Sequence, residues 1–342
     1  MPEKRKLRVV MIGVGGFGAA RRERMRRTGL FDILASFDQD PEAMRQAQAE
    51  DGAVPVKSYA SLLRTPGAEA AVIATGAKFH AAQVLAALAA GLHVFVEKPL
   101  CSTAREMHAL LAAQAATGLV VGVGHDDHTC NPVSRAIKGV LDRGELGTLV
   151  SFEMTTAHRG GFLVQPGDWR NDPKKNPGGM LFQCGVHLLH ELLYYFGPVA
   201  KVSSMMRYDL HTTATADVTL CLLELECGLT GTLSAYHVAP YRHTIFLYGT
   251  KANLFLHTNF IEPGTQVLIQ AARGDWGLDR PAALAIVGEE DLSGDVRSFH
   301  AAVTGGAAPY PSIVDGARAV AVCFAAEKAA RTGRTVAVEK IG

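Results

Sequence analysis

A glycine-rich loop directly between an apolar strand and a helix constrains the fold of this chain more than any other feature. Residues 7–12 predict a buried strand and residues 17–28 predict a helix. A loop of this kind turns sharply, lets the backbone approach a pyrophosphate and lets the helix pack closely on the strand. The pattern therefore predicts a nucleotide-binding α/β domain. The loop consists of Gly13, Val14, Gly15, Gly16, Phe17 and Gly18.

A carboxylate follows the second predicted strand. Residues 32–37 are mostly apolar, and Asp38 comes next, twenty residues after Gly18. An acid at this interval accepts hydrogen bonds from the ribose hydroxyls of a dinucleotide and repels a 2′-phosphate. Asp38 therefore favours NAD over NADP, and residues 39–41 supply no arginine that would reverse the preference.

The charge balance gives no general drive toward nucleic acid or acidic membranes. Among 342 residues, 34 are Lys or Arg and 33 are Asp or Glu. The arginines at positions 21, 22, 24, 26 and 27 are therefore interpreted as a solvated helix face. The six cysteines form no Cys-x-x-Cys pair, and no long apolar segment follows the start. We expect a cytoplasmic protein without a zinc ribbon, a disulfide framework or a membrane span.

Strands and helices alternate as far as residue 123. Apolar segments at 70–75, 93–97 and 119–123 predict strands of one parallel sheet, whose ligand would lie at the carboxyl ends of the strands. Thr75 and Lys98 both come at such ends. We therefore expect Thr75 to border the nicotinamide ribose and the Lys98 ammonium to lie beside the cofactor. A plain surface lysine is the alternative.

The pattern changes after His125. β-rich segments at 149–156, 199–208, 216–226, 229–236 and 244–248 predict a mostly antiparallel, open-faced sheet. We expect a Rossmann domain at 1–125 and a substrate-binding and oligomerisation α+β domain at 126–342. A late helix at 314–332 could pack back on the first domain. An open sheet face is suited to a partner subunit, so a homodimer or homotetramer is predicted.

One predicted helix, from Met180 to Tyr195, carries most of the chemistry of the second half. Gln183, His187 and Glu191 recur at intervals of four and would share one helix face. His187, His190 and Glu191 could also be interpreted as metal ligands. The spacing differs from His-Glu-x-x-His and no third ligand is evident, so no metal is expected.

These segments together resemble the glucose–fructose oxidoreductase / inositol dehydrogenase / rhizopine-catabolism (Gfo/Idh/MocA) family over nearly the whole chain. The Glu-Lys-Pro and Gly-Gly…His blocks, in this order, are the most specific. The matching segments are Gly13 to Gly18, Asp38, 74–80, 90–99 ending in Glu97-Lys98-Pro99, 144–147, Asp168-Trp169-Arg170, Gly178-Gly179…His187, and Asp315-Gly316.

The resemblance implies an NAD(P)-dependent oxidoreductase acting on a secondary alcohol or ketone of a sugar, cyclitol or sugar derivative. It implies that Lys98 bonds the reacting oxygen and orients the nicotinamide, and that His187 is the acid/base. An ammonium and an imidazole around one oxygen would stabilise alkoxide character. The resemblance also implies cofactor contacts by His80 and Glu97.

Three departures from the family pattern bear on the substrate. Gln183 stands where related inositol dehydrogenases commonly carry an aspartate, and an amide cannot accept a proton. Proton transfer would then fall to His187, Lys98 or water, while Gln183 could bond a substrate hydroxyl. His190 replaces another common aspartate, and residues 125–131 replace the usual basic-aromatic stretch. These departures favour a sugar or cyclitol oxidoreductase over a simple inositol dehydrogenase.

Further residues could line the substrate site, although packing or surface roles would explain each equally well. Trp169 could stack on a sugar ring and Arg170 could grip a carboxylate or phosphate. The complete set is His125, Asp168, Trp169, Arg170 and Tyr236.

Two other functions use the same scaffold. A hydrolase or lyase could oxidise a carbon transiently with NAD and then restore it, giving no net NADH. A non-catalytic NAD-binding regulator is the second alternative. It would be expected to lose the lysine or the histidine, yet Lys98 and His187 are both present.

Overall fold

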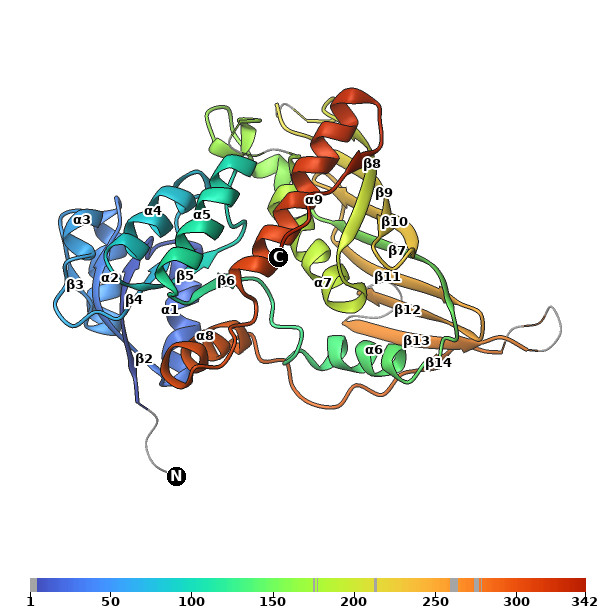
Figure 1. Cartoon of the computed structure of the whole chain (residues 1–342), viewed down its shortest axis with the longest axis horizontal. Helices are drawn as coiled ribbons and strands as arrows, with labels where there is room; N and C mark the ends of the chain where they lie inside the picture. The colour runs from blue at the N-terminus through green and yellow to red at the C-terminus, as the bar shows by residue number, and fades with distance from the viewer. Residues whose placement is uncertain are drawn as a thin grey trace. The chain divides into compact units, whose positions relative to one another are not determined.

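The computed structural model describes residues 5–174, 176, 178–211, 214–258, 264–273, 277 and 279–342 (Figure 1). The chain divides into two compact units. Unit 1 comprises Met1–Asp127 and Asp291–Ala317, and unit 2 comprises His128–Glu290 and Arg318–Gly342. Residues 291–317 were expected in the second domain. They belong to unit 1 because their helix packs on the sheet of that unit.

Unit 1 is built on a six-stranded sheet of parallel strands in the order β3-β2-β1-β4-β5-β6, as far as the described residues show. This is the Rossmann order, and it confirms the predicted fold class. The strands are β1 (Leu7–Ile12), β2 (Phe31–Phe37), β3 (Val54–Pro55), β4 (Ala70–Ile73), β5 (His93–Glu97) and β6 (Val121–Gly124).

Local sequence signals fix the helices of unit 1. Asp40 caps α2 and is followed by Pro41 at the first helical position, while Thr103 and Glu106 form a reciprocal capping box on α5. The helices are α1 (Phe17–Thr28), α2 (Pro41–Asp51), α3 (Tyr59–Leu62), α4 (Ala77–Ala89), α5 (Ala104–Thr117) and α8 (Gly294–Gly305).

Helix α8 was not predicted, yet it completes the core of unit 1. The Phe299 ring lies edge-on to the Phe95 ring, with centroids 5.6 Å apart. Both side chains are 1% exposed and belong to the main apolar cluster of the sheet. Removing α8 would therefore expose the aromatic surface of β5.

The arginines of α1 correct one expectation. They do not all form a solvated face, because Arg21 and Arg22 are each 1% exposed. Arg22 lies against Asp51 and donates from Nη2 to Glu50 at 3.2 Å, so its charge is paired across α2. Arg27 fits the solvated interpretation, since it is exposed and pairs with Glu23 one turn away at 2.8 Å.

Unit 2 contains a nine-stranded sheet, counted over the described residues, in the order β14-β13-β12-β11-β7-β10-β9-β8-β15. Among the described residues, every neighbouring pair of strands is antiparallel except β7–β10, as expected for a mostly antiparallel sheet. The strands are β7 (Leu149–Ala157), β8 (Val199–Arg207), β9 (Val218–Leu225), β10 (Thr230–Tyr236), β11 (Arg242–Gly249), β12 (Ala252–Thr258), β13 (Thr265–Ala271), β14 (Ala282–Ala283) and β15 (Val336–Ala337).

Helices cover one face of this sheet. The Phe196 ring at the end of α7 stacks on Phe152 of β7 with a centroid distance of 5.8 Å. Alternate residues of β8 and β9 point the other way and are exposed. The remaining helical elements are α6 (Pro132–Asp142), η1 (Gly160–Leu163), η2 (Trp169–Asn171), the π-helix η3 (Leu181–Gly185), α7 (Val186–Phe196) and α9 (Ile313–Thr332), which starts in unit 1.

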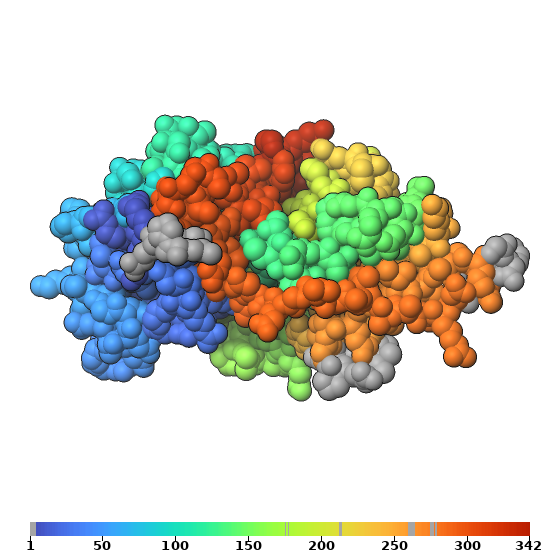
Figure 2. Space-filling model, turned by 90° about the horizontal axis from the view of Figure 1, so that it is seen from below, coloured from blue at the N-terminus to red at the C-terminus, as the bar shows by residue number. Residues whose placement is uncertain are grey.

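A segment before α8 follows helix α6 within unit 2. Asn131 Nδ2, at the start of α6, lies 3.4 Å from Glu290 Oε1, and Figure 2 shows the orange segment along the green helix. Asn131 also caps α6 by accepting from Val133 and Ser134. Within the described residues, no helix combines the length and apolar character that crossing a bilayer requires.

Candidate active site

The glycine loop of unit 1 has room only for glycine at two positions. A Cβ at Gly13 would lie 2.6 Å from the Ala74 carbonyl oxygen, and the residue has a φ of +79°. A Cβ at Gly18 would lie 2.1 Å from the carbonyl oxygen of Gly13. The absent side chains allow β1, β4 and α1 to approach one another. This tight strand–loop–helix junction is the cradle expected for the pyrophosphate of a dinucleotide.

Asp38 lies against this loop, as its position in the sequence predicts. Its Oδ2 accepts hydrogen bonds from the backbone nitrogens of Val14 at 2.8 Å and Gly15 at 3.2 Å. Its Oδ1 accepts from the Asp40 nitrogen at 3.0 Å. The carboxylate therefore sits at the mouth of the loop and also holds the loop in shape.

The strand order places a ligand crevice at the carboxyl ends of β1 and β4. The connection from β1 runs to β2 on one side, whereas β4 and β5 lie on the other, so the order reverses between β1 and β4. Open α/β sheets bind their ligands at such a switch point. Gly13 follows β1, Thr75 follows β4 by two residues, and Lys98 directly follows β5. These predicted residues therefore share one edge of the sheet.

The His80 side chain joins two of the loops at this edge of the sheet. Its Nδ1 lies 2.8 Å from the Pro99 carbonyl oxygen and its Nε2 lies 2.9 Å from the Thr75 carbonyl oxygen. Burial lowers the pKa of His80, although both carbonyls favour the protonated ring. Because His80 is 1% exposed, its position fits a role in holding the Thr75 and Lys98 loops together better than direct contact with a cofactor.

The neighbouring predicted residues of unit 1 differ in exposure. Lys98 is half-buried, whereas Glu97 is buried and directs its carboxylate toward Arg21. Thr75 donates its hydroxyl to Gln83 Oε1 at 2.6 Å. His125 follows β6 and is 1% exposed. Of this group, Lys98 is thus the side chain best placed to meet a ligand.

In unit 2, the predicted continuous helix opens with a π-helix, which corrects its geometry. Gly179 has a φ of +54°, and a Cβ there would lie 2.3 Å from the Ala216 carbonyl oxygen. This close approach to the start of β9 accompanies the widened turn of η3. Gln183 lies in η3 and His187 in the first turn of α7, so they are not one regular α-turn apart. Gln183 is buried and His187 is half-buried.

A chain of amides fixes the orientation of Gln183. Asn176 donates from Nδ2 to the Arg170 carbonyl oxygen at 2.8 Å, so its Oδ1 faces Gln183 and accepts from Gln183 Nε2 at 2.9 Å. A carbonyl can only accept, which sets the direction of both amides. Asn176 is fully buried and was not among the predicted residues. Its partners follow from the folded loop, and no sequence motif marks it.

Cys184 of η3 contacts His158, which in turn contacts His237. Gly160 donates its N–H to His158 Nδ1 at 2.7 Å, so His158 Nε2 carries the proton toward Cys184 Sγ at 2.8 Å. The His158 and His237 rings meet edge-on at 5.2 Å. The pKa of His237 is lowered to about 4, mainly by burial and then by His158, while Asp217 opposes the change. His237 is therefore neutral at pH 7. None of these three side chains was predicted from the sequence to belong to the site.

The predicted substrate residues of η2 contact one another. Asp168 caps η2 through the Arg170 nitrogen and pairs with the Arg170 guanidinium at 3.2 Å. That guanidinium lies 4.9 Å from the centre of the Trp169 ring. The Arg170 carbonyl also joins this turn to Asn176 and hence to Gln183. Tyr236 lies nearby along the backbone, since its carbonyl accepts from the His158 nitrogen at 3.0 Å.

Glu191, one turn after His187 in α7, is a buried acid with two side-chain partners. Glu191 accepts from the Tyr195 hydroxyl at 2.9 Å and lies 3.3 Å from His243 Nε2 of β11. Burial alone would raise the pKa of Glu191, but His243, His128 and Tyr195 together outweigh it and the pKa is lowered. Glu191 thus serves the packing of α7. Across the described part of the chain, no three His, Cys, Asp or Glu side chains are arranged to hold a metal ion.

Two family profiles match the chain. One, described as oxidoreductase family, NAD-binding Rossmann fold, covers residues 7–125, and the GFO/IDH/MocA C-terminal domain covers residues 134–255. The chain belongs to the GFO/IDH/MocA oxidoreductase family. For this GFO/IDH/MocA protein, the resemblance seen in the sequence is therefore confirmed, together with an NAD-binding Rossmann domain in unit 1.

Curated relatives of this GFO/IDH/MocA chain are about a quarter to a third identical to it over the aligned residues. 1,5-Anhydro-D-fructose reductase of Ensifer adhaerens is 25% identical over 83% of this chain and 84% of that enzyme. scyllo-Inositol 2-dehydrogenase (NAD(+)) of Bacillus subtilis is 26% identical over 58% of this chain and 57% of that enzyme. With several relatives, the chain thus spans little more than half of the relative's length.

Solved structures of other dehydrogenases share the fold. Levoglucosan dehydrogenase in complex with NADH and L-sorbose has a TM-score of 0.85 at 20% identity, over 98% of this chain and 100% of that one. The WlbA dehydrogenase from Bordetella pertussis, in complex with NADH and UDP-GlcNAcA, has a TM-score of 0.83 at 19% identity, with the same coverage. At these identities the comparison establishes the fold.

Proposed function

We propose that this chain is an NAD-dependent dehydrogenase or reductase that interconverts a secondary alcohol and a ketone on a sugar, cyclitol or sugar derivative. The observation that carries the proposal is the common sheet edge of unit 1. There the glycine loop, which excludes any side chain at Gly13 and Gly18, follows β1, and the half-buried Lys98 follows β5 at the same edge of the sheet. The names of the relatives, a sugar-derivative reductase and an inositol dehydrogenase, support the substrate class.

Lys98 and His187 would divide the polar chemistry. In the oxidation direction, the hydroxyl proton passes to the His187 imidazole, and the carbon–hydrogen bond breaks with its electron pair as the C=O bond forms. The bound nicotinamide supplies the hydride acceptor. The Lys98 ammonium donates a hydrogen bond to the oxygen and stabilises its negative charge. An imidazole ring can both accept and donate a proton, which suits the transfer in either direction of the reaction.

Asp38 supports NAD as the preferred cofactor. Its carboxylate lies at the mouth of the glycine loop, where a ribose diol could donate to it and a 2′-phosphate would be repelled. Gly15, Gly16 and Phe17 complete the proposed cofactor loop, and Phe17 is 52% exposed at the start of α1.

Unit 2 would supply the substrate contacts. Gln183, Asp168, Trp169 and Arg170 already form one connected group through Asn176. A neutral amide at position 183 would bind a hydroxyl without taking its proton, which leaves the base role to His187. His125 and Tyr236 are proposed as further lining residues.

A substrate panel with matched variants tests the function. Cyclitols, monosaccharides, uronates and nucleotide sugars would be offered with NAD and NADP, following absorbance of the reduced nicotinamide. With the best substrate, Lys98→Ala and His187→Asn should each lower kcat by about 10²- to 10⁴-fold. Lys78→Ala, an exposed lysine of α4, is the control and should retain full activity.

The same assay separates the alternatives. Stoichiometric NADH release supports net oxidation, whereas product without net NADH supports the cycling hydrolase or lyase. If Lys98→Ala turned over as fast as the unmodified chain, Lys98 would not be catalytic. Absence of turnover across the whole panel would contradict the proposed substrate class.

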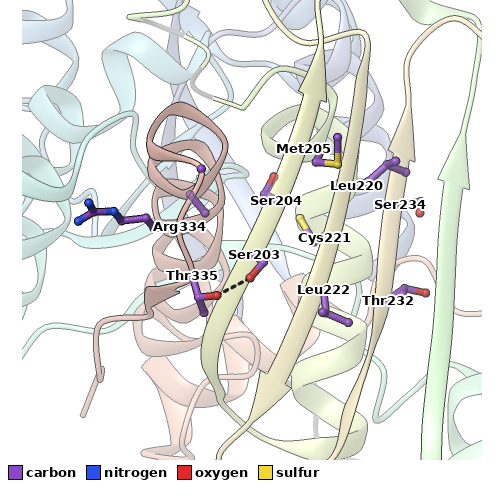
Figure 3. Close-up of a pocket in the computed structure, with 12 residues that line it drawn as sticks. Ser203, Ser204, Met205, Leu220, Cys221, Leu222, Thr232, Ser234, Arg334 and Thr335 are labelled. Carbon is purple, nitrogen blue, oxygen red and sulfur yellow. Dashed lines mark hydrogen bonds between the residues drawn. The ribbon is translucent and has the colours of Figure 1, made fainter.

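We further propose a homodimer or homotetramer formed through the open face of the unit 2 sheet. Met205 is 75% exposed, Leu222 58% and Leu220 43% on β8 and β9. With the end of α9, where Thr335 bonds Ser203 at 2.7 Å, these strands border a groove of about 540 Å³ (Figure 3). A contiguous apolar surface of this kind is typical of protein interfaces.

A further inference from the structure

A fully buried arginine joins three elements of unit 1. Arg21 of α1 donates from Nε to Glu97 Oε1 at 2.6 Å and from Nη1 to Asp295 Oδ2 at 2.7 Å. Its guanidinium also lies 4.7 Å from the centre of the Phe95 ring. The side chains of Arg21, Glu97 and Asp295 are 1%, 6% and 4% exposed. We call these three residues the Arg21 triad. It ties the helix that opens at the glycine loop to the end of β5 and to the first turn of α8.

A glycine on β6 makes room for the triad. A Cβ at Gly124 would lie 2.6 Å from Glu97 Oε2, so the carboxylate occupies the space that any other residue would fill. Gly124 pairs with Glu97 in the sheet register. Among the described residues, no hydrogen-bond donor reaches Glu97 Oε2. The position of this carboxylate is thus set by Arg21 on one side and by the bare backbone of β6 on the other.

Placement of Glu97 determines where the next residue emerges. Glu97 is the last residue of β5, so holding its side chain inside the core also fixes the backbone from which Lys98 leaves the strand. His80 holds the following residue, because its Nδ1 lies 2.8 Å from the Pro99 carbonyl oxygen. The residues on either side of Lys98, Glu97 and Pro99, are therefore both held in place. The Lys98 side chain between them is half-buried.

The charges of the triad do not balance. Two carboxylates face one guanidinium in the interior, where removing charges from water is costly. Burial raises the pKa of Asp295 to about 6, with Glu97 adding to the rise and Arg21 opposing it. Burial alone would lower the pKa of Arg21, but both carboxylates outweigh it and the pKa is raised. Apolar residues could fill this space at lower electrostatic cost, so a purely structural role explains the arrangement poorly.

We propose that Arg21, Glu97 and Asp295 are positioning residues that fix the Lys98 ammonium at the carboxyl end of β5. This inference rests on the proposed function for its catalytic consequence, but the placement of Lys98 can be measured without any substrate. The triad also couples that placement to α1, so disturbing it should affect dinucleotide binding.

Chemical labelling of Lys98 tests the placement directly. The intact chain would be treated with limiting acetic anhydride, and acetylation of each lysine followed by mass spectrometry, with the other lysines as internal standards. In Glu97→Gln the rate of Lys98 labelling should change at least about threefold, because ammonium reactivity depends on environment and exposure. NADH affinity, measured by fluorescence titration, should fall in parallel. Glu50→Gln removes a carboxylate that pairs with Arg22 and Arg26, and should change neither measurement.

A second variant covers the case in which Glu97→Gln does not fold. Gly124→Ala alters no charge but displaces the Glu97 carboxylate, and should shift Lys98 labelling in the same way. Arg21→Lys keeps the charge but loses the two-pronged contact, so it should shift Lys98 labelling in the same way but by less than Glu97→Gln does. With a substrate in hand, all three variants should lower kcat by about 10- to 100-fold with a smaller change in KM.

Two results would separate failure of this inference from failure of the proposed function. Unchanged Lys98 labelling and NADH affinity in folded Glu97→Gln or Gly124→Ala would overturn the positioning role. If labelling shifts as expected but Lys98→Ala retains full turnover, the triad still positions Lys98, and it is the catalytic assignment that fails.

Discussion

The Asp38 carboxylate accepts a hydrogen bond from the backbone nitrogen of Val14, with Oδ2 and N 2.8 Å apart. One residue thus has two tasks, because the acid proposed to bind the cofactor ribose also braces the loop proposed to hold the pyrophosphate. The two sites are coupled before any ligand binds. Changes at Asp38 should therefore affect the whole dinucleotide contact.

Asp38→Ala should raise the NADH dissociation constant by about tenfold or more, since it removes a charged acceptor from the loop and the ribose. It should also reduce the ratio of the NADPH to the NADH dissociation constant, because the carboxylate that repels a 2′-phosphate is gone. Fluorescence titration with both reduced cofactors measures the two effects. Asp40→Ala removes the neighbouring cap of α2 and serves as the control. Equal NADH affinity in Asp38→Ala and the unmodified chain would contradict the cofactor assignment.

Gly13→Ala should abolish measurable NADH binding and lower the free energy of unfolding by about 1–3 kcal/mol, because the new Cβ would meet the Ala74 carbonyl. Gly91→Ala is a matched control: Gly91 has a φ of +78°, close to the +79° of Gly13, but has open space around it. Urea denaturation of both variants isolates the clash from the cost of a positive φ. Equal destabilisation would mean that the close approach to β4 is unimportant.

Gln183→Glu should destabilise the chain by about 1–3 kcal/mol at pH 7. Asn176 Oδ1 faces position 183, so a carboxylate there would set two acceptors against each other unless Asn176 turned and lost its bond to Arg170. The loss should shrink on acidification, as the new carboxyl takes up a proton and becomes a donor. Thermal melts between pH 5 and pH 8 would show this, with the exposed Gln165→Glu as control. A pH-independent loss would argue against the amide chain.

His237 should make stability depend on pH in the acid range. Its folded pKa of about 4 lies below the ordinary value of 6.5, so the unfolded chain binds more protons between these values. Stability is then highest above about pH 6.5 and falls as the pH drops toward 4, by on the order of 1–3 kcal/mol. His237→Gln should flatten this part of the profile, whereas the exposed His108→Gln should not. An unaltered profile for His237→Gln would contradict the assignment.

Leu222→Glu should shift the chain toward the monomer, because a charge would be placed in the middle of the proposed interface. Light scattering after size exclusion measures the mass. Leu163→Glu, at an 81% exposed position of η1 in the same unit, should leave the mass unchanged. A monomeric unmodified chain would rule out the proposed assembly.

Much of unit 1 could be predicted because its signals are local. The glycine loop, the strand before it and the acid at position 38 lie within about thirty residues, and the structure places them in contact. The buried role of Arg21 could not be predicted from the same stretch, since its partners Glu97 and Asp295 lie 76 and 274 residues away. A run of arginines in the sequence predicts a solvated helix face, and only the folded structure shows that distant carboxylates bury one of them.

The less regular parts of unit 2 could not be predicted from local sequence, because tertiary contacts determine their geometry. Local sequence favours a plain α-helix from Met180, and the π-turn accompanies the close approach of Gly179 to Ala216. Strands β12 and β13 were not predicted, and they are held in the sheet by pairing with each other and with β11. The convergence of Lys98 and His187 on one carbon remains a prediction.

The division of the chain into units has a practical consequence for dissection. Unit 1 draws on two stretches of sequence, so a fragment ending near residue 127 would lack α8. Such a fragment would leave the Arg21 guanidinium with one carboxylate instead of two and would open the Phe95 ring to water. An exchange of domains between relatives would therefore have to transfer residues 291–317 together with the amino-terminal segment. These late residues complete the core of the Rossmann unit, although nearly the whole second unit separates them from it in sequence.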